Sequence, residues 1–175
     1  MADEIGDGGL FVERTILDKL VSEVRHFHNR DFLKAAMAVC ALAAVADDEV
    51  KLSEHYRINA ILAKEPALLA LDSKKAIDTL YVYVNALQTD WSSAAEVLYK
   101  KVRRMAGNHK RARTLMRVAY LVIAADGEVN HKEREEFGRI CDMLSLDPRE
   151  VFPEQASSAP TGSIHSWASS GDSRG

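Results

Sequence analysis

The sequence predicts an all-α fold of about seven to eight helices, and three observations support this prediction. Apolar residues recur at helical spacing through most of the chain, and no segment shows the period-two alternation of a strand. One helix–corner–helix unit also occurs twice. With 175 residues, 47% of them apolar and 28% charged, the chain has the composition of a globular domain with a sizeable core.

Three helices are predicted in the first part of the chain. Apolar residues at helical spacing predict a helix over residues 11–29, after a Gly- and Asp-rich N-terminus (1–10) that we expect to be flexible. Asp31 is a candidate cap for the next helix, "FLKAAMAVCALAAVA", which is apolar nearly all round and is therefore expected at the centre. A third helix is expected over 53–64, interrupted by Pro66.

Capping residues place the later helices. Asp72, Asp90 and Asp147 each precede a helical pattern and are predicted N-caps, and Gly107 is a predicted helix terminator. The predicted elements are a helix after Asp72, helices over 91–105, 108–125 and 131–144, and a short last turn in "LDPREVF".

The C-terminal segment differs in composition from the rest. Residues 154–175 are rich in Ser, Gly and Ala, which predicts a disordered tail, because such a segment buries too little apolar area to offset its ordering entropy. Ile164 and Trp167 are its isolated apolar residues, and a docking role for them stays an alternative. The helical domain is therefore expected to span 11–153.

The internal repeat is the most informative feature. Without a gap, "MAVCALAAVADDEVKLSE" (37–54) matches "MRVAYLVIAADGEVNHKE" (116–133) at eight of eighteen positions. Each copy reads as a buried helix, an acidic corner and a second amphipathic helix. We therefore expect two helical hairpins packed face to face with approximate two-fold symmetry.

The repeated carboxylates allow two interpretations. Both copies carry Asp-x-Glu-Val-x-x-x-Glu, and an Asp at a helix C-terminus is unfavourable beside the negative end of the helix dipole unless a cation is present. In the second copy Asn130 and Glu133 form a capping-box pattern that needs no ligand. In the first copy Lys51 cannot cap, and yet Glu54 is retained, which favours a second role for the acids.

An all-oxygen ligand set predicts a hard cation. Ca²⁺ is favoured, with Mg²⁺ as the alternative, and the spacing differs from that of an EF-hand. Zinc is less favoured because His55 and His131 do not recur in the repeat. The candidate metal ligands are Asp47, Asp48, Glu49, Glu54, Asp126, Glu128 and Glu133.

Basic residues gather in one block between Glu96 and Asp126. The block carries a charge of +8 and the rest of the chain −11, which together give the net −3. Solvated helix faces are the simplest interpretation, and docking on an anionic membrane or an acidic partner is the alternative. No recognition-helix or stacking pattern for nucleic acid accompanies the charge, because Trp91 and Tyr99 are expected in the core. The eight residues are Lys100, Lys101, Arg103, Arg104, Lys110, Arg111, Arg113 and Arg117.

No pattern typical of an enzyme is found. The sequence has no G-x-S-x-G, P-loop or H-E-x-x-H motif. Cys40 and Cys141 lie among apolar neighbours and are expected to be buried, reduced thiols, although an exposed thiol of lowered pKa would support a redox role. The acidic start "MADEIGDGG" has no signal-peptide pattern and no segment reaches bilayer-spanning length, so we expect a cytoplasmic protein.

These residues resemble the tellurite-resistance TerB family. The resemblance runs from about residue 13 to 153 and depends on the two acidic corners, "AADGEVN" among them, and on the closing "LSLDPREVF". It implies an all-helical domain of two interlocked bundles with pseudo-symmetry and a metal-binding surface formed by both corners. One departure is Asp47-Asp48, where the family has Asp-Gly, so Asp48 either tolerates a positive φ or changes the turn.

The resemblance also implies a role and partners. The family is associated with resistance to tellurite and other stresses, and similar proteins are thought to act at the inner face of the cytoplasmic membrane. The implied partners are a TerC-type membrane protein and calcium-binding TerD-type proteins. We therefore expect a non-enzymatic, cation-binding stress-resistance protein. The alternative is a helical adaptor without metal, whose acidic face docks a basic partner.

Overall fold

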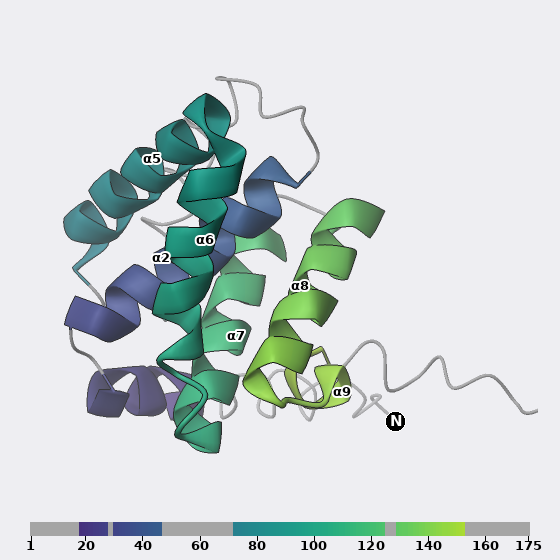
Figure 1. Ribbon diagram of the computed structural model, residues 1–175. Coiled ribbons are helices and arrows are strands. Elements are labelled where there is room, and N and C mark those ends of the chain that lie inside the picture. The colour runs from purple at the N-terminus through teal and green to yellow at the C-terminus, as the bar shows by residue number, and fades with distance from the viewer. Residues whose placement is uncertain (1–17, 28–29, 47–71, 125–128, 153–175) are drawn as a thin grey trace, which may run out of the picture.

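All regular structure in the described part of the chain is α-helical, as predicted. The computed structural model describes residues 18–27, 30–46, 72–124 and 129–152. Residues 18–27 are helical. The labelled helices in Figure 1 are α2 (Arg30–Val45), α5 (Ser73–Thr89), α6 (Trp91–Arg103), α7 (His109–Ala124), α8 (His131–Leu144) and α9 (Pro148–Val151).

Helix α2 is the centre of the fold. Twelve of its sixteen residues are buried, because alanines and other apolar residues occupy every face. It packs against α5, α6, α7 and α8, and it passes behind α6 in the view of Figure 1. The sequence prediction of a central helix is confirmed. The helix starts at Arg30, so Asp31 lies inside the first turn rather than at the predicted cap.

Helices α5 and α6 form a hairpin over one side of α2. Asp90 joins them and serves both: its backbone N–H donates to the carbonyl of Ala86, and its side chain accepts from the Ser93 N–H. Asp72 caps α5 in the same way, as predicted. The inner faces contribute the apolar core residues Ala76, Leu80, Val84, Leu87, Ala95, Leu98 and Val102.

Helices α7, α8 and α9 cover the other side. Tyr120, Phe137 and Phe152 form an aromatic cluster among the three helices, with ring centroids 4.8–5.9 Å apart. Asp147 caps α9 and Pro148 occupies its first turn, as predicted. The short last turn thereby closes the bundle through its buried aromatic end.

The predicted boundaries agree closely with the structure where it can be compared. Helix α8 has the predicted limits, α7 differs by one residue at each end, and α6 ends two residues early at Arg103. The predicted helix over 53–64, the N-terminus 1–10 and the tail 154–175 lie outside the described residues. None of the helices that the structure describes is long and apolar enough to span a membrane.

Candidate functional site

Only one of the seven predicted metal ligands can be placed. Glu133 lies in the first turn of α8, whereas the other six carboxylates fall outside the described residues. Those six are Asp47, Asp48, Glu49, Glu54, Asp126 and Glu128. Among the residues that the structure describes, no group of three or more metal-ligating side chains is found. The metal site therefore stays a prediction.

Glu133 completes the capping box that the sequence predicted. The Asn130 side chain accepts from the Glu133 N–H at 2.9 Å, and Glu133 Oε2 accepts from the Asn130 N–H at 2.8 Å. Arg134 Nε donates to the carbonyl of the buried Val129 at 2.8 Å. These bonds fix the start of α8 and hold the Glu133 carboxylate at the backbone N–H of Asn130, the residue that caps the helix.

The two helices that lead into the acidic corners contact each other. Cys40 of α2 lies with its sulfur 3.9 Å from the carbonyl oxygen of Ala119 on α7. The sequence repeat pairs these same two positions. In Figure 1 both helices run upward, so their C-terminal ends, at Val45 and Ala124, point toward the same end of the molecule.

Most residues of the basic block have a partner within the fold. Lys100 lies 2.7 Å from Glu96 on its own helix, and Lys110 lies 3.6 Å from the buried Glu23. Two residues of α7 contact Glu150: Arg113 approaches its carboxylate at 3.8 Å, and Arg117 donates twice to its backbone carbonyl, at 2.9 and 3.2 Å. Arg103 and Arg104 are exposed at the end of α6, and Arg103 Nε also donates to Met143 Sδ of α8 at 3.1 Å.

A buried carboxylate links α6 to α8. Glu136, only 3% exposed, accepts a hydrogen bond from the Tyr99 hydroxyl at 2.5 Å and one from Arg139 at 3.0 Å. Burial, and then the neighbouring Glu136 carboxylate, raise the pKa of Tyr99 to about 12. The hydroxyl therefore stays protonated and donates, which makes the cluster a structural link between the two helices.

Both cysteines are buried thiols, as predicted. Burial raises the pKa of Cys40 to about 12, and burial together with Asp142 and Asp147 raises that of Cys141 to about 12. At neutral pH such thiols carry almost no reactive thiolate. Thiol chemistry would need an exposed cysteine with a lowered pKa, and neither Cys40 nor Cys141 is such a residue.

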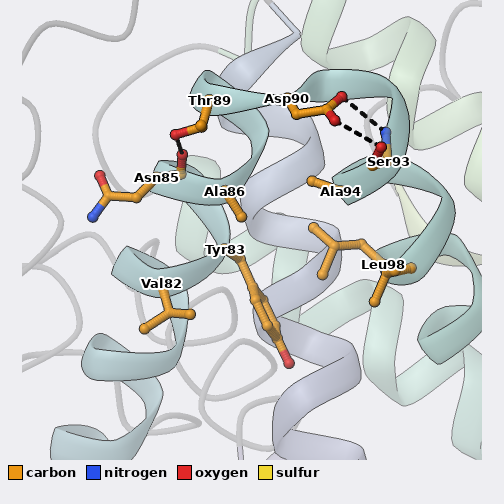
Figure 2. Close-up of a pocket in the computed structure, with 10 residues that line it drawn as sticks. Val82, Tyr83, Asn85, Ala86, Thr89, Asp90, Ser93, Ala94 and Leu98 are labelled. Carbon is orange, nitrogen blue, oxygen red and sulfur yellow. Dashed lines mark hydrogen bonds between the residues drawn. The ribbon is translucent and has the colours of Figure 1, made fainter.

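An apolar groove between α5 and α6 was not predicted from the sequence. Val82, Ala86, Ala94 and Val97, with further residues of α5 and α6, line an apolar groove of about 600 Å³ (Figure 2). Trp91, expected in the core, is 41% exposed, so that prediction is wrong. The signal in the sequence was the uncharged residues at helical spacing that line this groove, namely Val82, Asn85, Ala86 and Thr89 on α5 and Ser93, Ala94 and Val97 on α6.

Comparisons with known proteins identify the family. Residues 33–153 match the family described as "Tellurite resistance protein TerB", over most of the span of the resemblance seen in the sequence. Neither a comparison with curated proteins nor one with solved structures gives a match. The matched segment includes helices α5 to α9 and nearly all of α2. Because it covers more than half of the chain, this chain belongs to the tellurite resistance protein TerB family.

Proposed function

We propose that this chain is a non-enzymatic stress-resistance protein that binds a divalent cation at its two acidic corners. The cation is Ca²⁺ first and Mg²⁺ second, because the ligands are carboxylates, corner carbonyls and water. The first corner supplies Asp47, Asp48, Glu49 and Glu54, and the second supplies Asp126, Glu128 and Glu133. The observation that carries the proposal is the position of Glu133 immediately after the second corner.

Helix ends supply the electrostatic argument. Both α2 and α7 end at an acidic corner, and each C-terminus carries about half a negative charge from unpaired carbonyls. Carboxylates beside such ends are repelled by the negative partial charge there. A cation bound between them would interact favourably with both the carboxylates and the helix ends. The contact between Cys40 and Ala119 and the common direction of the two helices place the C-terminal ends of α2 and α7 toward one end of the molecule, which supports the proposal.

The capping role of Glu133 is compatible with binding a metal. One carboxylate has about four acceptor positions, and the bond from the Asn130 N–H uses one of them. The same bond holds the carboxylate beside the corner, which lowers the entropy lost when a cation orders it. In this proposal the capping box holds Glu133 in place for the cation and also starts the helix.

A titration with a matched variant tests the cation proposal. Amide resonances of the labelled full chain are followed as Ca²⁺, Mg²⁺ or Zn²⁺ is added. Residues 47–54 and 126–133 are expected to shift with Ca²⁺. Glu133→Gln keeps the capping geometry, since Gln also completes a capping box, but removes the charge, so it should weaken Ca²⁺ binding and leave the apo protein folded.

The control and the contrary result are equally specific. Asp142→Asn removes an exposed acid near the far end of α8 and should leave Ca²⁺ binding unchanged. If the amide resonances of the two corners do not shift at millimolar metal, the cation proposal is wrong. If the corners shift but Glu133→Gln binds Ca²⁺ like the wild type, Glu133 is not a ligand.

The proposed setting is a membrane-proximal assembly with TerC-type and TerD-type proteins. Support comes from the family and from the exposed arginines that close α6, Arg103 and Arg104, within the Lys100–Arg117 block. An anionic bilayer attracts such side chains by roughly 1 kcal/mol each. Co-sedimentation with phosphatidylserine vesicles should therefore fall for the Arg103→Gln, Arg104→Gln double variant. Equal sedimentation of both proteins would remove the membrane from the proposal.

The alternative function is a metal-free helical adaptor whose acidic face docks a basic partner. The complete capping box at Glu133 favours it, because that box explains the acid without any ligand. Under this alternative, the amide resonances of the two corners do not shift when Ca²⁺ is added, and a chelator does not release a bound basic partner. The titration above therefore separates the two functions.

A further inference from the structure

Two exposed valines mark a face that the core does not use. Val82 on α5 is 63% exposed and Val97 on α6 is 52% exposed. Both border the groove between the two helices, where Ala86 of α5 lies across from Ala94 of α6 (Figure 2). The inner faces of the same helices already supply the core. The outer apolar face is therefore additional to what the fold requires.

The outer face of α6 has a charge order along its length. Asp90, Ser93, Val97, Lys101 and Arg104 follow at intervals of three or four residues and therefore share one side of the helix. The acid lies at the N-terminal end, the bases lie at the C-terminal end, and the centre is uncharged. Such a stripe is complementary to a copy of itself turned end to end.

We propose that this face is a homodimer interface in which α6 packs antiparallel against α6 of a second copy. A two-fold axis near the middle of the stripe sets Asp90 opposite Lys101 of the second copy and Val97 opposite Ala94 of the second copy. A parallel arrangement would instead set Asp90 against Asp90. In the antiparallel arrangement the two helix dipoles point in opposite directions, which is the favourable orientation for side-by-side helices. On the α5 side, Val82 enlarges the contact area.

The size of the face predicts a weak dimer. Helix α6 has 13 residues and is about 20 Å long, and two neighbouring helices are together roughly 20 Å wide. The footprint of about 400 Å² per copy is half of the ~800 Å² that a standard interface contributes. We therefore expect a dissociation constant of roughly 10–100 μM, governed by protein concentration.

Sedimentation equilibrium of the full chain tests the proposal. From ~10 μM to ~1 mM the wild type should shift from monomer toward dimer. Val97→Glu places a charge at the centre of the contact and should raise the dissociation constant at least about tenfold. Lys132→Glu is the matched control, because it also adds negative charge on an exposed helix surface, on α8, and it should dimerise like the wild type.

A charge pair tests the orientation. Lys101→Glu sets like charges opposite each other twice per dimer and should raise the dissociation constant about three- to tenfold. Adding Asp90→Asn should recover part of this loss. Asn is used because it caps α6 as well as Asp does, so the monomer fold is kept.

Cross-linking tests the register directly. Mixed Ala94→Cys and Val97→Cys variants should form a disulfide between the two different variants in preference to either one with itself. The native thiols are buried and give little background. A monomer throughout the concentration range, or a dimer that Val97→Glu leaves intact, overturns the proposal. Preferential linking of either variant with itself overturns the antiparallel register.

Discussion

Helices α2 and α7 carry the two copies of one sequence pattern, yet their surroundings differ. The repeat pairs Ala38 with Arg117, and the same register carried backward pairs Ala35 with Thr114. Ala35 and Ala38 are completely buried, because other helices surround α2. On α7 the paired positions are polar, and each has a partner on another element.

The partners of α7 explain the difference. The Thr114 hydroxyl donates to the buried carboxylate of Glu23 at 2.9 Å, and Arg117 donates twice to the Glu150 carbonyl. Helix α7 thus combines an apolar face toward α2 with a polar face that anchors its outer neighbours. A repeat can therefore preserve helices and a shared contact while position in the fold determines which faces stay apolar.

Exchanging the paired residues between the two helices should have the largest effect. Ala38→Arg introduces into α2 the residue that α7 carries, at a site with no exposure. An unpaired buried cation should cost more than about 4 kcal/mol of unfolding free energy, enough to prevent folding. Circular dichroism and urea denaturation measure this.

The reverse exchange is the control. Arg117→Ala removes two hydrogen bonds from a half-buried site that water can reach, so it should cost only about 1–2 kcal/mol. A folded Ala38→Arg protein as stable as Arg117→Ala would contradict the different surroundings described for α2 and α7.

Local signals explain what the sequence could predict. Asn130 and Glu133 lie three residues apart, and so do Asp72 and Lys75, so the caps and the helix ends could be read directly. The central place of α2 followed from its continuous apolar composition. These features depend on neighbours along the chain, which the sequence displays.

Features that depend on tertiary packing could not be predicted. Thr114 and Glu23 lie 91 residues apart, and no local pattern in either segment indicates that the two side chains form a hydrogen bond. Trp91 was placed in the core because its apolar character was visible in the sequence, whereas its exposure at the first position of α6 was not. For the candidate cation site, only the capping role of Glu133 is confirmed, and the ligand role of all seven acids stays a prediction.

Removing the hydroxyl of Thr114 should have an intermediate effect. Thr114→Val keeps the shape of the side chain but leaves Glu23, 7% exposed, without this donor. We expect a loss of about 1–3 kcal/mol in the free energy of unfolding. In the Glu23→Gln background the same substitution should cost less, because no buried charge is left behind. Urea denaturation of the four proteins measures the coupling, and equal losses in both backgrounds would contradict it.

The smallest effect at neutral pH is expected where the two helices meet. Cys40→Ala makes position 40 identical to its partner Ala119 and should cost about 1 kcal/mol or less. Its effect grows in alkali. Burial raises the pKa of Cys40 from 9.0 to about 12, so the unfolded chain loses this proton first. The stability that the thiol contributes is therefore present below pH 9 and is lost as the pH rises toward 12.

Urea unfolding under reducing conditions, at a series of pH values, measures this loss. The wild type should lose about 1–2 kcal/mol more than Cys40→Ala between pH ~8 and ~10.5. Cys141 and Tyr99 have raised pKa values of the same sign, so a weaker decline should persist in the variant. Cys141→Ala is the matched control on α8, and it should remove the part of the alkaline stability loss that comes from Cys141. Parallel curves for the wild type and Cys40→Ala would mean that the thiol ionises in the folded protein as readily as in the unfolded chain, and the contact between α2 and α7 would then have to be open to water.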